Sequence, residues 1–316
     1  MTEPSAIAGG IRHFLDLDRL DRATLRHILD RAAAMKAARG GGWPTGRPDA
    51  DAPLGGHVLL MVFQKASTRT RLSFEGAMRQ LGGVASDLEG DRLQLGRGES
   101  IADTARVLSL FGDAILLRTS RHDNLLEMAA HAGVPVINAL TDRSHPCQIV
   151  ADLLTLEESF GGLDGLPVAW LGDGNNVTAS LIHAAALTGL DLRLACPPDR
   201  RPDAATLEAA RAAGARLTVT GDVAEAVRDA AAVYTDTWQS MGAEPVEGGL
   251  FEPYRVDADV MARARGDALF LHCLPAHRGD EVTDAVMDGP QSAVWRQADN
   301  RLHAQKAILT WCLTGN

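Results

Sequence analysis

Short apolar runs alternate with longer segments of helical periodicity along most of the chain. Residues 58–63 form an unbroken apolar run, which predicts a buried strand, and Phe74, Ala77 and Met78 then follow at the spacing of one helix face. Further strands are expected at residues 84–88, 113–119, 134–138, 166–171, 190–195, 215–220, in the residues before 236, and at 269–275. Further helices are expected at residues 14–39, 101–111, 148–160, 176–187, 204–213 and 223–230, with a last helix opening at residue 299.

This alternation predicts the fold class, which is α/β with two doubly wound parallel-sheet domains of similar size joined by helices. We expect one domain to comprise residues 1–150, with the C-terminal helix 301–316 packing back on it, and the other to comprise residues 151–300. The length of 316 residues suits two hydrophobic cores better than one.

Composition and charge argue against several kinds of partner. The chain is 46% hydrophobic and 23% charged, which is typical of a globular protein. Its net charge of −10 argues against a nucleic-acid partner, because phosphate contacts need clustered Lys and Arg. No apolar run approaches the roughly 20 residues of a membrane span, and residues 1–10 lack a signal-peptide pattern, so we expect no membrane partner and a cytoplasmic location.

The cysteines indicate neither cross-links nor a metal site. There are four of them, spaced far apart and without a C-x-x-C pair, so neither a disulfide framework nor zinc binding is expected. Reduced thiols are therefore the default expectation.

The stretch Ser67-Thr68-Arg69-Thr70-Arg71 combines a strand end, a turn and the start of a helix. The first backbone N–H groups of a helix have no partner within it, and the helix dipole adds partial positive charge there. Three hydroxyl and two guanidinium groups join those N–H groups, so the stretch predicts a phosphate-binding site. A capped helix with arginines in solvent is the alternative, and it fits a lone Ser-Thr pair better than this sequence.

Polar residues also stand at one strand end and at one helix start among the other expected elements. Arg118 stands at the carboxyl end of the strand at 113–119, where parallel sheets bind ligands, although a solvated arginine is also compatible with the pattern. His145 and Gln148 flank Pro146, which suits the first turn of a helix, and both can donate to a carbonyl or a phosphate. A capping histidine is the alternative for His145.

The second half carries a glycine turn that resembles a dinucleotide fingerprint only in part. The run Leu171-Gly172-Asp173-Gly174 follows an expected strand, but Val177 occupies the place of the last glycine, so the turn fails as an NAD fingerprint at that position. Further on, Asp236 follows a strand and can hold an ammonium group, with Ser240-Met241-Gly242 as a nearby loop. Cys273 ends another strand, and a cysteine at such a position is usually a small hydrophobic side chain packed in the core.

The motifs together resemble those of the aspartate/ornithine carbamoyltransferase family. Ser67-Thr68-Arg69-Thr70-Arg71 is similar to its carbamoyl-phosphate motif, and His145-Pro146-Cys147-Gln148 to its His-Pro-x-Gln. Ser240-Met241-Gly242 and His272-Cys273-Leu274-Pro275 resemble the ornithine-type members, whereas aspartate-type members carry a proline at the position of Cys273. The resemblance runs from about residue 14 to residue 311.

This resemblance implies carbamoyl transfer from carbamoyl phosphate to the δ-amine of L-ornithine, in a cleft between the domains. Arg69, Arg118, His145 and Cys273 would be catalytic. Carbamoyl phosphate would be bound by Ser67, Thr68, Arg69, Thr70, Gln94, Arg118, His145, Gln148, Cys273, Leu274 and Arg301. Ornithine would be bound by Asn176, Asp236, Ser240 and Met241.

The resemblance also implies a homotrimer, or a multiple of trimers, whose active sites are shared between subunits through the loop containing Gln94. Neither a metal nor an organic cofactor is implied, because carbamoyl transfer involves no redox or hydride step. Arginine synthesis is the favoured role over arginine breakdown.

Two alternatives belong to different classes. Transfer to another amine, such as putrescine or N-acetylornithine, would not need the contacts to the α-amino and carboxylate groups that Asp236 and the Ser240-Met241-Gly242 loop provide. A non-catalytic module that binds phosphate or a nucleotide is supported by the glycine turn. The co-occurrence of the whole motif set argues against such a module: Arg69, His145, Gln148, Cys273 and Arg301.

Overall fold

The computed structural model describes residues 10–40, 46–65, 67–89, 98–238 and 249–315. The chain divides into two compact units, one made of residues 1–150 and 301–316 and the other of residues 151–300. Two helices cross the division, because α5 (Pro146–Phe160) and α11 (Val294–Thr314) each begin in one unit and end in the other.

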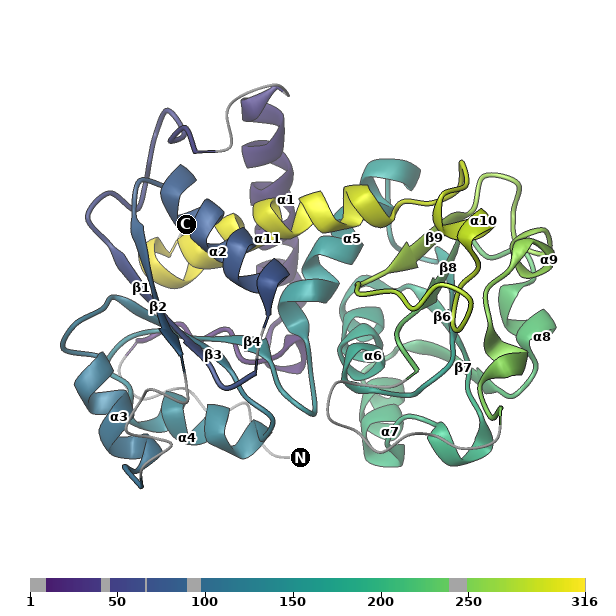
Figure 1. Cartoon of the computed structure of the whole chain (residues 1–316), viewed down its shortest axis with the longest axis horizontal. Coiled ribbons are helices and arrows are strands. Elements are labelled where there is room, and N and C mark those ends of the chain that lie inside the picture. Colours follow the sequence, from purple (N-terminus) through teal and green to yellow (C-terminus); the bar gives the residue numbers. More distant parts are fainter. Residues whose placement is uncertain (1–9, 41–45, 66, 90–97, 239–248, 316) are drawn as a thin grey trace. The chain divides into compact units, whose positions relative to one another are not determined.

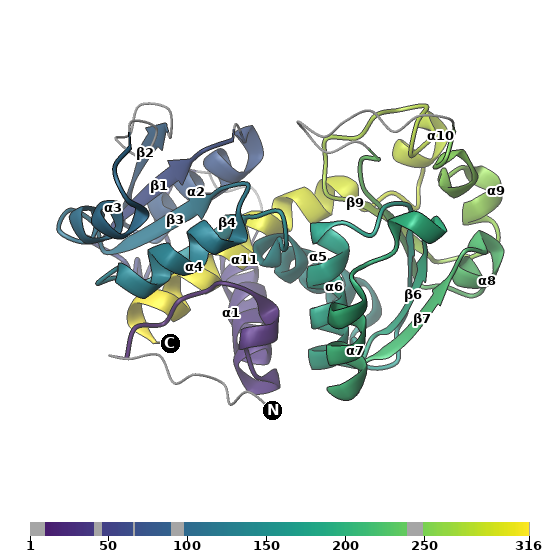
Figure 2. The ribbon, with the colours of Figure 1, turned by 90° about the horizontal axis from the view of Figure 1, so that it is seen from below.

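The N-terminal unit is built on a four-stranded parallel sheet in the order β2-β1-β3-β4. The strands are β1 (Val58–Phe63), β2 (Val84–Glu89), β3 (Ala114–Arg118) and β4 (Val136–Leu140). Helices α3 (Ile101–Leu108) and α4 (His122–His131) cover one face, and α1 (Arg22–Arg39), α2 (Thr68–Gln80) and α11 cover the other (Figure 1). A short 3-10 helix, Leu17–Arg19, precedes α1 (Figure 2).

The C-terminal unit is built on a five-stranded parallel sheet in the order β7-β6-β5-β8-β9. The strands are β5 (Pro167–Leu171), β6 (Asp191–Ala195), β7 (Arg216–Thr220), β8 (Ala232–Thr235) and β9 (Leu269–His272). The helices are α6 (Asn176–Thr188), α7 (Ala204–Ala212), α8 (Val223–Val227), α9 (Ala258–Met261) and α10 (Asp284–Met287), with 3-10 turns at Pro198–Arg200 and Glu252–Tyr254. The prediction of two doubly wound parallel α/β domains is therefore confirmed.

Apolar runs fill both cores as their patterns predict. In the N-terminal unit, a cluster of buried side chains joins β1, β3 and β4 to α3 and α4, with Val62, Ile115 and Leu125 among its members. In the C-terminal unit a second cluster joins β5, β8 and β9 to α8, α9 and α10. Strands buried on both faces read as continuous hydrophobic runs rather than alternating ones, which is why these segments were recognisable.

Several element boundaries differ from the expected ones. Helix α2 begins at Thr68, so the Ser-Thr-Arg-Thr-Arg stretch forms the first turn of the helix rather than a turn before it. Strand β4 runs two residues later than expected, because it follows Pro135 and ends at Leu140. Helix α11 starts at Val294 instead of residue 299, which places Arg301 inside the helix. Ser100 caps α3, since its hydroxyl accepts from the Asp103 N–H at 3.0 Å.

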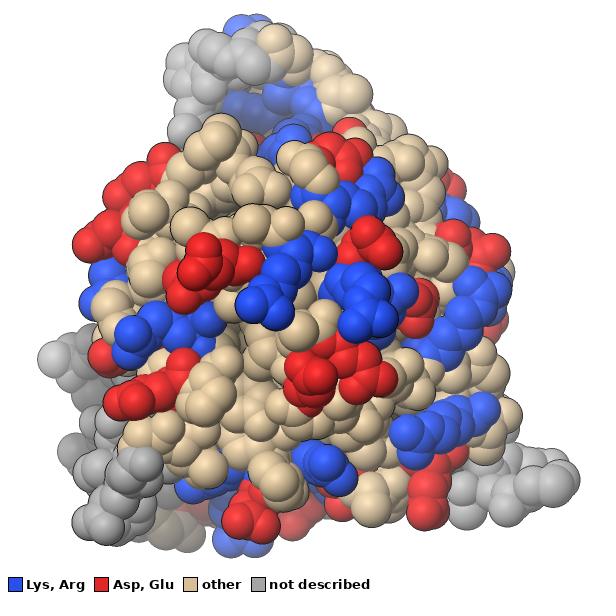
Figure 3. All heavy atoms as spheres, turned by 90° about the vertical axis from the view of Figure 1, so that its right-hand side faces the viewer, with Lys and Arg blue, Asp and Glu red and all other residues tan. Residues whose placement is uncertain are grey.

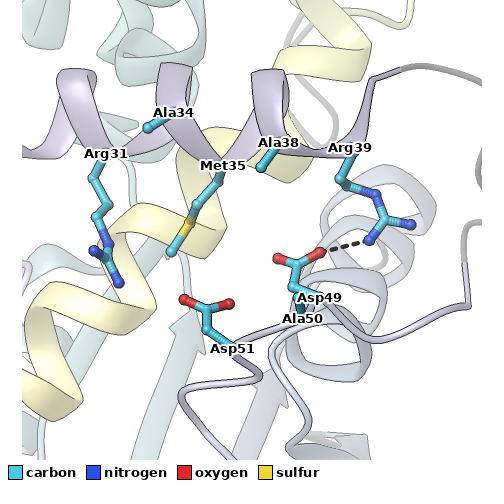
Figure 4. A pocket seen from close by; sticks show the side chains of 8 residues that line it. All are labelled: Arg31, Ala34, Met35, Ala38, Arg39, Asp49, Ala50 and Asp51. Atoms are coloured by element: carbon cyan, nitrogen blue, oxygen red, sulfur yellow. Dashed lines mark hydrogen bonds and ion pairs between the residues drawn. The ribbon is translucent and has the colours of Figure 1, made fainter.

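A buried ionic cluster joins α1 and α11 to the segment before β1. Lys306 is fully buried on α11, and its ammonium group pairs with Asp49 and donates to Gln80 Oε1 at 3.1 Å. Arg39, at the end of α1, donates to the same Asp49 carboxylate at 2.6 Å (Figure 4). Burial is the main cause that lowers the pKa of Lys306, and Asp49 opposes it. One carboxylate thus fixes the C-terminal helix to the N-terminal one.

Surface charge is mixed on the side of the molecule drawn in Figure 3. Lys and Arg side chains alternate there with Asp and Glu over short distances. Among the described residues, no helix combines the length and the apolar character that crossing a membrane requires.

Candidate active site

The sheet of the N-terminal unit changes direction between β1 and β3. The chain goes from β1 to β2 on one side and then crosses to β3 on the other side of β1. In open α/β sheets, ligands bind beyond the carboxyl ends of the strands at such a switch point. Phe63, the last residue of β1, is paired with Arg118, the last residue of β3. The two predicted anion-binding segments, Ser67 to Thr70 and Arg118, therefore follow the two strands that flank the switch point.

Helix α2 presents its N-terminus just after β1. Ser67 is the N-cap, with an extended backbone at φ −159°, and its side chain makes no capping hydrogen bond with the described residues of the first turn. Thr68 and Arg69 are exposed, while Thr70 is buried. The second guanidinium of the motif is engaged elsewhere, because Arg71 pairs with Asp87 of β2. Arg69 is exposed and forms no ion pair with the residues that the structure describes, so it differs in this respect from Arg71.

Arg301 brings three predicted residues of the N-terminal unit together. Its side chain is only 4% exposed, and its guanidinium donates to Gln148 Oε1 and, at 2.8 Å, to Thr70 Oγ1. These acceptors come from α5 and from the first turn of α2, so one side chain of α11 links both helix starts. Such a fork, held by two acceptors, keeps its other N–H groups in a fixed direction.

His145 lies beside these groups, between β4 and α5. It is 5% exposed, and its pKa is lowered well below the ordinary value, first by burial and then by the charges of Arg301 and Arg118. The imidazole is therefore neutral at pH 7 and offers one N–H donor and one acceptor. A neutral donor beside two guanidinium groups suits a carbonyl oxygen on which negative charge develops.

The sheet of the C-terminal unit has its own switch point, between β5 and β8. Hydrogen bonds join the ends of the two strands there. Thr235 donates its hydroxyl to Leu171 O at 2.7 Å, and Asn175 donates its amide to Asp236 Oδ2 at 2.9 Å. Asn175 also caps α6, because its side-chain oxygen accepts from the Val177 and Thr178 N–H groups. Asn176, the first residue of α6, is half-buried beside it.

Cys273 and Leu274 follow β9, the next strand along this sheet. The Cys273 thiol donates to Asp236 Oδ1 at 2.8 Å, so two of the predicted residues are in direct contact. Leu274 has a positive φ of 61°, and its N–H donates to His272 Nδ1 at 2.9 Å. Because β9 ends at His272, Cys273 lies just after the strand rather than at its end.

Some of the residues that build this site were not among the predicted ones. Asn175, which holds the Asp236 carboxylate, was missed, although an asparagine directly before a helical segment is a recognisable capping signal. Gln297 was also missed; its side-chain oxygen accepts from the His272 N–H at 2.9 Å. Three predicted residues, Gln94, Ser240 and Met241, lie outside the described residues.

Fold and site together define a class. Each unit is a doubly wound parallel α/β domain that carries polar side chains at its switch point: an arginine-rich set in the N-terminal unit and a carboxylate with amide and thiol partners in the C-terminal unit. Proteins of this class bind small polar or phosphorylated ligands at strand ends.

Comparison with known proteins identifies the family. Residues 12–158 match the carbamoyl-P binding domain of aspartate/ornithine carbamoyltransferases, and residues 164–312 match the Asp/Orn binding domain. The chain is similar to the ornithine carbamoyltransferase of Rhizorhabdus wittichii, with 56% identity over 304 residues that cover 96% of this chain and 98% of the relative. It is also similar to that of Caulobacter vibrioides, with 53% identity over 314 residues covering 99% and 98%.

Solved structures agree. The ornithine carbamoyltransferase of Pyrococcus furiosus matches with a TM-score of 0.90 and 45% identity, covering 96% of this chain and 98% of the other. The anabolic ornithine carbamoyltransferase of Campylobacter jejuni matches with a TM-score of 0.88 and 34% identity, covering 97% and 100%. This chain belongs to the aspartate/ornithine carbamoyltransferase family.

Proposed function

We propose that the chain transfers the carbamoyl group of carbamoyl phosphate to the δ-amine of L-ornithine, giving L-citrulline and phosphate. The observation that carries the proposal is that each sheet has a set of polar side chains at its switch point. The N-terminal set offers donors for an oxyanion at the ends of β1 and β3, and the C-terminal set offers a carboxylate for an ammonium group after β8. The identities of 52–56% to ornithine carbamoyltransferases support ornithine as the acceptor.

The N-terminal set would bind carbamoyl phosphate. Ser67, Thr68, Arg69 and Thr70 supply backbone N–H, hydroxyl and guanidinium donors for the phosphate, which must leave as an anion. Arg118, His145 and Gln148, with Arg301, would share the phosphate and the carbonyl oxygen. Donors that are held in place before the reaction stabilise the developing oxyanion without reorganisation, and the Arg301 bonds to Gln148 and Thr70 provide that fixation. Gln94, which lies outside the described residues, would complete the phosphate contacts.

The C-terminal set would bind ornithine. Asp236 would accept from the α-ammonium group, with Asn176 at the same end of the substrate, and Ser240 and Met241, outside the described residues, would contact its polar groups as well. Cys273 and Leu274 would lie near the reacting amine and the carbamoyl group. Free δ-amine has a pKa of about 10, so it must lose its proton before it attacks. Turnover is therefore expected to rise with pH between about 6 and 9 while substrates are saturating, because only the neutral amine is a nucleophile.

A homotrimer, or a multiple of trimers, belongs to this proposal. Leu72 on α2 and Val84 at the start of β2 are each 61% exposed, and in this proposal a neighbouring subunit would cover them. Light scattering on the purified protein should give a mass that is a multiple of three chains of 33.6 kDa. A monomer at micromolar concentration would contradict it.

Arginine biosynthesis in the cytoplasm is the setting we propose. One solved structure that resembles the chain is named an anabolic ornithine carbamoyltransferase. The cysteines Cys147, Cys196, Cys273 and Cys312 are all free thiols, which fits a reducing compartment.

Two substitutions test the division of substrates between the two sets. Arg69→Ala should lower kcat about 10²–10³-fold, the loss typical of removing one oxyanion donor, while Arg79→Ala, exposed on the same helix, should change it little. Unchanged citrulline formation by Arg69→Ala would instead support a non-catalytic phosphate-binding module.

Asp236→Asn should raise KM for ornithine about 10–100-fold, because a hydrogen bond to a charged group contributes about 1.5–3 kcal/mol, and should leave KM for carbamoyl phosphate unchanged.

A further inference from the structure

The loop that follows β9 gathers three metal-binding side chains outside the residues assigned to carbamoyl transfer. One ligand atom each from His277, Asp280 and Glu281 lies within 4.8 Å of the others. All three belong to one short segment of the C-terminal unit, so their spacing does not depend on distant parts of the chain.

Glu281 is the residue that points to a missing ligand. Its side chain is 0% exposed, and its Oε1 accepts from the His277 N–H at 2.6 Å and lies 3.1 Å from His272 Nε2. Its Oε2 is buried and has no hydrogen-bond partner among the residues that the structure describes, and the His277 ring nitrogen Nδ1 lies 3.9 Å away. A buried carboxylate oxygen without a donor is costly, and a cation bound there would remove that cost.

A second cluster nearby, formed by Asp236, His272 and Cys273, is less suited to a metal. Both ring nitrogens of His272 are already engaged: Nδ1 accepts from the Leu274 N–H, and Nε2 is therefore the N–H that donates to Glu281. The Cys273 thiol donates to Asp236. A metal there would have to break these bonds, whereas at His277 Nδ1 it would compete, within the described part of the chain, with the Thr237 hydroxyl at 3.1 Å.

The cluster has an entry path and a favourable charge. It opens into a cavity of about 370 Å³ whose lining also includes Glu252 and Arg255. Arg255 donates its Nε–H to the backbone carbonyl of Asp280 at 2.8 Å, so it holds the backbone of the loop there. Among the described residues, the Asp280 carboxylate forms no salt bridge, so it is available as a ligand.

We propose that His277, Asp280 and Glu281 form a binding site for a divalent transition metal, with Zn²⁺ as the ion that best matches one imidazole and two carboxylates. Zn²⁺ takes nitrogen and carboxylate ligands at about 2.0–2.2 Å, and water would complete its tetrahedral shell. The ion takes no part in carbamoyl transfer. It connects the two ends of the loop that follows Cys273 and Leu274.

Calorimetric titration of the full chain with ZnCl₂, after removal of metal by a chelator, tests the site. We expect one saturable site per chain, at least tenfold weaker binding in Asp280→Asn and in His277→Ala, and unchanged binding in Asp259→Asn, an exposed aspartate of the same unit. The same titration in a Cys273→Ser background should also give one site. Cobalt(II) bound in place of zinc should show no sulfur-to-metal charge-transfer band.

Three outcomes would overturn the proposal. Absence of saturable binding at pH 7.5 would mean that no metal ion balances the Glu281 carboxylate. Equal affinity in Asp280→Asn, His277→Ala and the unsubstituted chain would place the zinc elsewhere. Loss of the site in the Cys273→Ser background would assign it to the Asp236, His272 and Cys273 cluster.

Discussion

Two hydrogen bonds fix the guanidinium group of Arg301, and for that reason we expect its removal to slow the reaction. Because Gln148 and Thr70 accept from it, its remaining N–H groups are already oriented when a substrate arrives. We expect Arg301→Ala to lower kcat/KM for carbamoyl phosphate about 10²–10³-fold, the usual cost of losing a preorganised donor. Steady-state citrulline formation measures this effect.

Arg296→Ala is the matched control for this substitution, because Arg296 is exposed on the same helix. It should leave kcat/KM unchanged. Equal losses in both variants would show that the effect comes from the stability of α11, and a circular-dichroism melt of each variant would identify that case.

His145 makes stability depend on pH. Its pKa in the folded chain is lowered well below the ordinary value by burial, then by Arg301 and Arg118, whereas in the unfolded chain the imidazole has its ordinary pKa of about 6.5. Between those two pKa values the unfolded chain binds a proton that the folded chain does not, so the free energy of unfolding falls as pH is lowered through this range. Burial lowers the pKa values of His13 and His122 as well, so these two histidines also make the free energy of unfolding fall as pH is lowered.

We therefore expect His145→Gln to make the free energy of unfolding fall less steeply between pH 7 and pH 5.5. The difference is at most about 1.36 kcal/mol per pH unit, which corresponds to one proton. Urea unfolding at a series of pH values measures it, with His27→Gln, an exposed histidine of α1, as the control. Identical slopes for His145→Gln and the unsubstituted chain would mean that His145 is not buried in neutral form.

The loop between β5 and α6 has a backbone approach that only glycine permits. A Cβ added to Gly174 would lie 2.4 Å from the backbone nitrogen of Pro202 and 2.6 Å from the carbonyl carbon of Arg201. Backbone atoms cannot move aside as a flexible side chain can, so alanine must displace the loop that leads to Asn175 and Asn176. We expect Gly174→Ala to destabilise the chain by about 1–3 kcal/mol, as overpacking does, and to raise KM for ornithine.

Thermal unfolding and steady-state kinetics check this expectation. Gly162→Ala is the control, because nothing lies within 4 Å of the added Cβ there, and it should alter neither quantity. A Gly174→Ala variant with unchanged melting temperature and unchanged KM would show that the loop tolerates displacement without loss of binding.

Long apolar runs made several strands predictable, whereas a helix with few buried residues was missed. Strands such as β1 and β3 were recognised because burial on both faces makes them continuously hydrophobic. Helix α4, His122–His131, was missed: its buried residues are His122, Leu125 and Met128, too few to mark a helix face by sequence alone. The start of α11 was misjudged because Trp295, which is exposed, masks the periodicity there.

Sequence patterns do not reveal which residues of the site contact one another. The Arg301 bonds join residues 231 positions apart, to Thr70, and 153 positions apart, to Gln148. Local patterns placed Arg118 at a strand end and His145 at a helix start, but they gave no information on strand order, which decides whether these two positions adjoin. Only the family resemblance pointed to Arg301, since nothing local distinguishes an arginine inside a helix.

The two units carry complementary chemistry, and the central claim is that one reaction uses both. The N-terminal unit offers guanidinium, hydroxyl and imidazole donors for a phosphorylated carbonyl compound, and the C-terminal unit offers the Asp236 carboxylate with Asn176 for an amino acid. In the proposed reaction, each set binds one of the two substrates. Neither set alone can transfer a group from one to the other.

Product formation from a panel of amines tests this claim most directly. The purified chain, given carbamoyl phosphate with ornithine, putrescine or N-acetylornithine in parallel, should form its product from ornithine with a kcat/KM at least a hundredfold above the other two, and Asp236→Asn should reduce that preference. Equal use of putrescine, which lacks the α-amino and carboxylate groups, or undiminished citrulline formation by Asp236→Asn would contradict the account.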